Sequence, residues 1–316
     1  MNDRTALVLG ATGGIGRPVA EGLAAHGWTV HALHRDPASL AKDALFEWRK
    51  GDALSPVDVA QAAKGASIIV HAVKPRAYRD WEKFVLPMID NTLAAADGRR
   101  VLIPGNVYNF GPDAGALIRE DAPQNPITRK GRLRAEMERR IEAAVNDGRA
   151  EATILRAGDF FGPGAGSSWF SQAMVRPGKR PKAVYTLGKP GVGHQWVYLP
   201  DLAETFVRLA ELEGQPKFAR FHMDGHWDAN GSQMAAAIAR ALGAPDVPVR
   251  TLPWLLLQLA APFSRDIREL TELKYLWDRP VRLSNQGLLR ALGTEPHTPL
   301  DKAVRQTLIA MRVAGQ

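Results

Sequence analysis

Short apolar runs alternate with longer amphipathic stretches through the first half of the chain. Each run has the length of a buried strand, and the stretches between them carry apolar residues at helical spacing. This alternation predicts a parallel β-sheet covered by helices, because parallel strands need long crossover connections that are usually helices. The predicted strands are Ala6–Leu9, Thr29–Leu33, Leu45–Trp48, Ser67–Val73, Val101–Ile103 and Thr153–Leu155, and the predicted helices are Gly14–His26, Pro56–Ala63, Trp81–Ala96 and Arg132–Val145.

The regular alternation ends in a Gly- and Pro-rich stretch, Gly158–Gly166, and the pattern beyond it is looser. We therefore expect an α/β fold, a doubly wound parallel sheet with a smaller C-terminal substrate-binding region. The expected domains are residues 1–162 and 163–316, with 195–212 returning to the first. Later elements are predicted as strands at Ala183–Leu187 and Gln195–Leu199 and helices at Asp201–Leu212, Ser232–Leu242, Leu300–Met311 and within 253–277.

A glycine-rich turn joins the first predicted strand to the first helix. A buried strand that turns into a helix leaves backbone N–H groups unpaired, and the helix dipole favours negative charge there. Glycines in such a turn let a pyrophosphate approach the backbone, so this context favours a dinucleotide-binding Rossmann domain over an ordinary turn. The candidate cofactor-binding residues of this turn are Gly10, Thr12, Gly13, Gly14, Ile15 and Gly16.

Two positions after later strands bear on the choice of cofactor. Arg35 follows the second strand, where a cation accommodates the 2′-phosphate of NADP and a carboxylate would bind the 2′-hydroxyl of NAD. The neighbouring Asp36 precedes a proline and fits a helix cap. Asp52 follows the third strand and is either an acceptor for the adenine amino group or a turn residue. We expect NADP, with NAD as the alternative.

Composition and charge narrow the classes of function. The 316 residues include no cysteine, which excludes disulfides and thiolate chemistry. The net charge is +8, but the basic residues are dispersed, which suits a solvated surface and an anionic cofactor better than nucleic acid. The most apolar run, Leu252–Phe263, is too short to span a bilayer, and we expect no signal peptide, because the first residues read as a strand. We expect no nucleic-acid or membrane partner and a cytoplasmic location.

Several motifs in order make the chain resemble an extended short-chain dehydrogenase/reductase of the NAD(P)-dependent epimerase/dehydratase type. The resemblance covers nearly the whole chain. It implies that Ala72 and Lys74, after the fourth strand, lie where the family's loop passes the nicotinamide side of the cofactor. The motifs are Gly10–Gly16, Gly51–Asp52, Val101–Pro112, Ile154–Pro163 and Trp196–Glu204.

The catalytic residues that the resemblance implies are replaced. The family uses a tyrosine and, four residues later, a lysine, with a Ser or Thr after the fifth strand. Thr128 and Arg132 stand at the first two positions. A gapless match puts Asn106 at the third, whereas a match of the Val-Tyr pair to the family's own puts Pro104 there. A threonine hydroxyl is a far weaker acid than a phenol, and an arginine does not titrate. Tyr108, after the same strand, is the nearest substitute proton donor, with Asn106 and Arg132 as electrostatic partners.

The sequence alone leaves two functions open. The first is an NAD(P)-binding oxidoreductase or epimerase that acts on a small carbonyl or hydroxyl substrate with a non-standard catalytic set. The second is a non-catalytic NADP-binding redox sensor or regulatory protein. Asp159 stands where sugar-nucleotide members carry an asparagine and would repel a pyrophosphate. His222 and His226 flank a predicted turn, so we assign no metal. A homodimer is the expected assembly.

Overall fold

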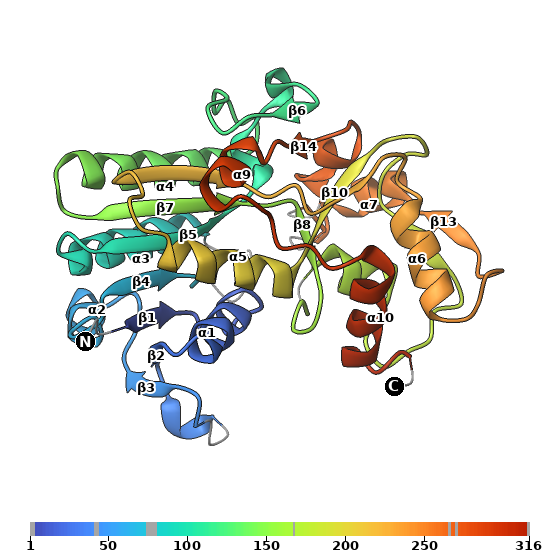
Figure 1. The fold of residues 1–316 in the computed structure, drawn as a ribbon. Coiled ribbons are helices and arrows are strands. Elements are labelled where there is room, and N and C mark those ends of the chain that lie inside the picture. The colour runs from blue at the N-terminus through green and yellow to red at the C-terminus, as the bar shows by residue number, and fades with distance from the viewer. Residues whose placement is uncertain are drawn as a thin grey trace.

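Seven parallel strands form the main sheet, in the order β11-β7-β5-β4-β1-β2-β3 (Figure 1). The computed structural model describes residues 4–40, 44–73, 81–166, 168–264, 267–268 and 271–314. The chain builds outward from β1 in both directions, which confirms the predicted doubly wound α/β fold. The strands are β1 (Thr5–Leu9), β2 (Thr29–His34), β3 (Glu47–Lys50), β4 (Ile68–His71), β5 (Arg100–Gly105), β7 (Glu151–Arg156) and β11 (Phe218–His222).

Helices cover both faces of this sheet because its strands are apolar on both sides. Val8 faces a core shared with Leu23 and Phe206, from α1 and α5. Leu7, its neighbour in the strand, faces the opposite core, which contains Ile89 from α3 and Ile141 from α4. The helices are α1 (Gly16–Ala25), α2 (Pro56–Ala62), α3 (Trp81–Ala96), α4 (Arg129–Asn146) and α5 (Leu199–Glu211).

Most of the remaining elements form a second region beside the carboxyl ends of the strands, on the right in Figure 1. Its largest sheet has three strands in the order β12-β10-β8. The described part of this region has strands β8 (Asp159–Phe161), β9 (Val184–Thr186), β10 (His194–Tyr198), β12 (His226–Asp228) and β13 (Val249–Thr251), and helices α6 (Gln233–Ala241), α7 (Trp254–Ala260) and α10 (Leu300–Ala310). Helix α9 (Gln286–Leu292) returns to the main sheet, where Leu288 is buried in the same core as Val8. A small pairing of β6 (Leu117–Ile118) with β14 (Arg282–Leu283) links the two regions.

A buried ion pair ties α4 to the end of β7. The Arg156 guanidinium is fully buried, and its Nε donates to Oε1 of Glu138 at 2.9 Å, while Nη2 donates to Oε2. Asn109 and Gln124 donate their side-chain amides to the same carboxylate, at 3.0 and 2.9 Å. Nη1 of Arg156 lies 3.0 Å from Nε2 of His222. The network therefore joins α4 and two strand ends to the 106–125 segment.

Two buried histidines make stability depend on pH. Burial lowers the pKa of His71 to about 3, and burial with the nearby charge of Arg156 lowers that of His222 to about 3. In the unfolded chain both titrate near 6.5, so below that pH the unfolded state binds more protons than the native state. We expect the free energy of unfolding to fall as pH is lowered from about 6.5 towards 3. Urea midpoints at pH 7.5 and 5.5 measure this, and equal midpoints would contradict it.

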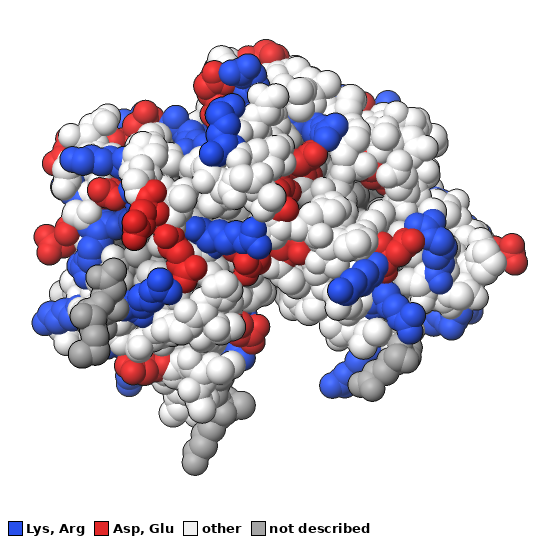
Figure 2. All heavy atoms as spheres, viewed as in Figure 1, with Lys and Arg blue, Asp and Glu red and all other residues white. Residues whose placement is uncertain are grey.

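Acidic and basic side chains are interspersed over the face shown in Figure 2, above all on the half that carries the main sheet. This agrees with the dispersed basic residues of the sequence. In the part of the chain that the structure describes, no helix is both long and apolar enough to cross a membrane.

Candidate active site

The glycine turn between β1 and α1 is built so that backbone segments pass within contact distance. Gly10 has a φ of +92°, and a Cβ there would lie 2.6 Å from the carbonyl oxygen of Ala72, after β4. A Cβ at Gly16 would lie 2.2 Å from the carbonyl oxygen of Gly10. Neither position accepts a side chain without movement of the backbone. The turn thus lies between the carboxyl ends of β1 and β4, where the strand order reverses and where α/β folds bind nucleotides.

The start of α1 presents backbone donors to this crevice. Gly13 N–H donates to the carbonyl of Gly10 at 2.8 Å, which closes the turn. The N-cap residue of α1 is Ile15, whose side chain makes no capping hydrogen bond. Thr12 is exposed and Gly13 to Ile15 are partly exposed. Small, partly exposed residues at a helix start fit a dinucleotide pyrophosphate.

An open pocket lies beside the glycine turn. A Cβ at Gly14 would lie 3.1 Å from the carbonyl oxygen of Gly164, so the two glycine-rich segments are in contact. The pocket, of about 470 Å³, is lined by Gly164 and its neighbours on one side and by Arg312 after α10 on another. Its walls come from the Gly162–Gly166 stretch and the C-terminal region. All of the lining residues come from 162–178 and 310–312, and the contact between Gly14 and Gly164 places this pocket next to the glycine turn.

The residues predicted to contact the adenosine half lie at the expected strand ends. Arg35 is exposed directly after β2. The Asp52 carboxylate accepts the Leu54 N–H at 3.0 Å, and the Asp52 N–H donates to the Asp58 carboxylate at 2.8 Å. Asp52 is therefore a turn residue in this structure, and its contact with adenine stays a prediction. Lys74 lies outside the described residues.

Thr128 caps helix α4. Its hydroxyl accepts the N–H of Gly131 at 3.0 Å, and only 7% of the residue is exposed. Arg132, one turn later, is exposed, and its guanidinium donates to the carbonyl of Ile127 at 3.3 Å. The position of the family's tyrosine thus holds a capping residue, and the position of its lysine holds a cation bonded to the backbone.

Asn106 and Tyr108 follow β5 and meet the same helix start. The Asn106 side-chain oxygen accepts the N–H of Tyr108 at 2.9 Å and begins the turn η2 (Val107–Asn109). A Cβ at Gly131 would lie 2.3 Å from the carbonyl oxygen of Tyr108, so η2 packs against the first turn of α4. The structure therefore brings Asn106, Tyr108 and Thr128 together, with Tyr108 meeting α4 through its backbone.

A second tyrosine at this helix start was not predicted. Tyr275, in the turn η5 (Lys274–Trp277), shares a hydrogen bond with the Thr128 hydroxyl and donates to the carbonyl of Phe110 at 3.4 Å. Burial raises the pKa of Tyr275 to about 12. It lies 147 positions after Thr128 in the chain, and no local sequence motif connects the two residues.

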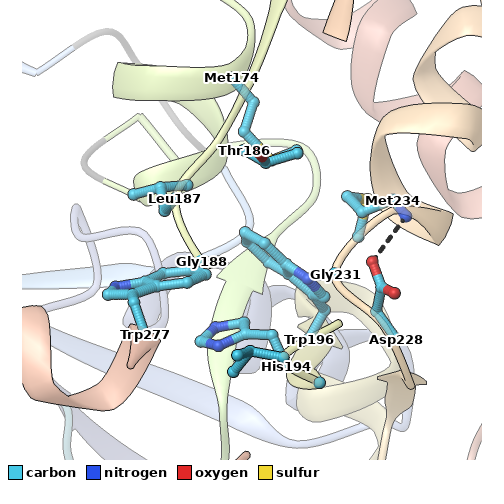
Figure 3. Close-up of a pocket in the computed structure, with 12 residues that line it drawn as sticks. Met174, Thr186, Leu187, Gly188, His194, Trp196, Asp228, Gly231, Met234 and Trp277 are labelled. Carbon is cyan, nitrogen blue, oxygen red and sulfur yellow. Dashed lines mark hydrogen bonds between the residues drawn. The ribbon is translucent and has the colours of Figure 1, made fainter. Parts of the chain in front are cut away.

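Figure 3 shows a small pocket among the aromatic residues next to η5. Its volume is about 10 Å³, room for about one water molecule. The His194 ring stacks on Trp277 with centroids 3.5 Å apart, and its Nε2 lies 2.8 Å from the Asp159 carboxylate. Asp159 is thus held by a histidine of the neighbouring strand. No group of three or more His, Asp or Glu side chains is placed to hold a metal within the described ranges.

Comparison with known proteins agrees with this geometry. The profile of the NAD-dependent epimerase/dehydratase family matches residues 6–219, more than half of the chain. The chain belongs to this family. A relative from Streptomyces sp, 3-diazoavenalumate denitrifying reductase, is 29% identical over 270 residues, which cover 78% of this chain and 84% of the relative.

Solved structures of the family share the fold over almost the full length. UDP-glucose 4-epimerase from Brucella ovis, in complex with NAD, has a TM-score of 0.77 at 17% identity and 98% coverage of both chains. UDP-glucose 4-epimerase from Thermotoga maritima, with UDP-glucose, has a TM-score of 0.76 at 16% identity and the same coverage. At these identities the likeness establishes the fold alone.

Proposed function

We propose that this protein is an NADP(H)-dependent reductase of small carbonyl compounds. The observation that carries the proposal is an intact dinucleotide cradle, at Gly10 and Gly16, beside an active-site position where Thr128 replaces the family's tyrosine. The bound nicotinamide would supply a hydride. A reductase named for a diazo compound among the relatives favours reduction over epimerisation.

The chain's own residues would bind and orient both partners. The glycine turn and the α1 start would hold the pyrophosphate, while Ala72 would lie along the nicotinamide side, as the family resemblance implies. At the α4 start, Asn106 and Arg132 would act as fixed polar groups around the substrate. Tyr108 remains the proton donor predicted from sequence. A homodimer also stays a prediction.

A sugar nucleotide is a poor fit to the second region. Asp159 occupies the position from which the family's asparagine reaches the substrate phosphates, and its carboxylate is paired with His194 at 2.8 Å. A carboxylate there repels a pyrophosphate. The pocket beside Gly164, at about 470 Å³, suits a small molecule. We therefore place the substrate among small aldehydes, ketones and enones.

A fixed panel of probes tests this function. NADPH oxidation would be followed with benzaldehyde, cinnamaldehyde, acetophenone, cyclohexenone and benzenediazonium. Steady turnover of at least one carbonyl compound is the expected result. Tight NADPH binding without turnover of any probe would instead support the non-catalytic redox sensor. Turnover of the diazonium ion alone would point to a reaction like that in the relative's name.

Arg35 makes the choice of cofactor testable. Replacing Arg35 by alanine should weaken NADPH binding by about 1.5–3 kcal/mol, because a charged hydrogen bond to the 2′-phosphate is lost. NADH lacks that phosphate, so its affinity should stay nearly constant and serves as the internal control. Calorimetric titration of both cofactors with both proteins measures the difference. Equal losses for the two cofactors, or a wild-type preference for NADH, would contradict the assignment.

A further inference from the structure

The phenol hydroxyl that meets Thr128 belongs to the C-terminal region. We propose that Tyr275 is the proton donor of the reaction, in place of a tyrosine at position 128. The inference rests on the proposed reductase function and adds to it the residue that completes the chemistry. It starts from two contacts of one hydroxyl group, with the Thr128 side chain and with the Phe110 carbonyl.

The hydrogen bonds at this site have one consistent direction. The Gly131 N–H donates to the Thr128 oxygen at 3.0 Å, and the Tyr275 O–H donates to the Phe110 carbonyl at 3.4 Å. The Thr128 proton is then left to donate to the Tyr275 oxygen. At 3.4 Å the bond to the Phe110 carbonyl is long, so it is easily exchanged for a bond to another acceptor. A substrate oxygen at that point could accept the phenol proton.

The turn that carries Tyr275 is fixed from both sides. Glu272, three residues earlier, accepts the backbone N–H of Lys130 at 3.2 Å, and its carboxylate lies 3.5 Å from the Lys130 Nζ. Trp277, two residues later, is 3% exposed and stacks on His194 in the aromatic cluster of Figure 3. Tyr275 is thus held against the first turn of α4 by anchors on its own segment.

The surroundings of the Tyr275 hydroxyl act on its acidity in both directions. Burial raises the pKa of Tyr275 to about 12, so the phenol is a weaker acid than a free tyrosine. It is still a stronger acid than the alcohol that reduction forms, so proton transfer to the developing alkoxide is favourable. The positive end of the 18-residue helix α4, together with the Thr128 hydroxyl, would stabilise the phenolate. Arg279 also favours the phenolate, and Glu272 opposes it.

The proposed step balances in protons and electrons. A hydride reaches the carbonyl carbon and forms the new C–H bond, and the electron pair of the C=O double bond moves to oxygen. Tyr275 donates its proton to that oxygen, which gives the alcohol. The phenolate is reprotonated by water. Reduction of an aryl diazonium ion needs no such proton, because the hydride forms a C–H bond as dinitrogen leaves.

Tyrosine-to-phenylalanine exchanges test the proposal, because each removes one oxygen atom and keeps the ring. Tyr275→Phe should lower kcat for the best carbonyl probe of the panel by about 100-fold or more, as for loss of a general acid. The KM and the NADPH affinity should change little. Tyr185→Phe, on strand β9, is the matched control and should leave kcat unchanged. Circular dichroism and urea midpoints check folding.

A readout other than activity distinguishes a donor from a structural residue. The infrared C=O stretch of the same probe, bound with NADP⁺, should lie at lower frequency in the wild type and return towards its free value in Tyr275→Phe. Thr128→Val removes the hydroxyl that forms a hydrogen bond with Tyr275 and should reduce the rate. Thr128→Ser keeps a hydroxyl there and should retain much of the wild-type rate. These variants keep the test open if Tyr275→Phe fails to fold.

The possible outcomes separate this inference from the proposed function. A wild type that reduces no probe, or the diazonium ion alone, overturns the assignment of Tyr275 together with carbonyl reduction. A wild type that reduces carbonyl compounds, with Tyr275→Phe equal to it in rate and infrared shift, overturns Tyr275 alone. A loss found in Tyr108→Phe and not in Tyr275→Phe would return the role to Tyr108.

Discussion

Replacing Glu138 by glutamine should lower the free energy of unfolding by about 3–5 kcal/mol. The exchange keeps the shape of the side chain but leaves the fully buried Arg156 guanidinium without its counter-charge. The side-chain amides of Asn109 and Gln124, which donate to the Glu138 carboxylate at 3.0 and 2.9 Å, also lose their charged acceptor. Urea unfolding, followed by tryptophan fluorescence, measures the change.

Glu136 is the matched control for this prediction, because it lies on the same helix but pairs with Arg139 and Arg140 near the surface. Arg139 is 70% exposed, so Glu136→Gln should cost no more than about 1 kcal/mol. Equal losses in the free energy of unfolding for the two glutamine variants would show that the buried pair stabilises the fold no more than the surface pair does. The double variant Glu138→Gln/Arg156→Met should recover part of the loss, since no buried cation remains.

Gly10→Ala should weaken the binding of either nicotinamide cofactor about 100-fold. The new Cβ would lie 2.6 Å from the Ala72 carbonyl oxygen and 2.8 Å from the Val73 Cα, so the turn must move away from β4. Loss of two charge-assisted hydrogen bonds to the pyrophosphate costs about 3 kcal/mol, which corresponds to that factor. Fluorescence titration with NADPH and NADH measures it.

Gly10→Ala combines two effects, the strain of a side chain at positive φ and the collision with the residues after β4. Gly27→Ala has only the first of them. Gly27 also has a positive φ, +82°, but nothing lies within 4 Å of a Cβ there. This variant should therefore carry only the backbone cost of about 1–2 kcal/mol, with unchanged cofactor affinity. Cofactor binding by Gly10→Ala at the level of Gly27→Ala would mean that the contact with β4 is not needed to shape the cradle.

The strands predicted from sequence are those whose residues are apolar on both faces, such as β1 and β4. The prediction at Leu45–Trp48 was two residues early, because β3 is a largely polar edge strand and Leu45 is 56% exposed. Strand β11 was not predicted. Its polar residues find partners on other elements, as Arg220 does with Glu142 at 2.7 Å, and such pairings leave no periodic pattern in the strand itself.

The candidate site also has one part that the sequence predicts and one part that it does not. The cradle at Gly10–Gly16 follows from a local motif, because strand, turn and helix are consecutive in the chain. The hydroxyl groups at the α4 start come from segments that only the tertiary fold brings together. Tyr275 meets Thr128 through a turn that Glu272 and Trp277 anchor, and none of these residues belongs to a recognisable sequence signature.

The path of the chain limits how this architecture can be recombined. After β10, in the second region, the chain returns through α5 to β11, which pairs in parallel with β7 at the edge of the main sheet. It then leaves again for β12 and α6. A substrate-binding region transplanted from another protein would thus need three splice points, one near residue 162 and one on each side of 199–222. A single crossover near residue 162 would also replace the α5 and β11 that complete the host's own sheet.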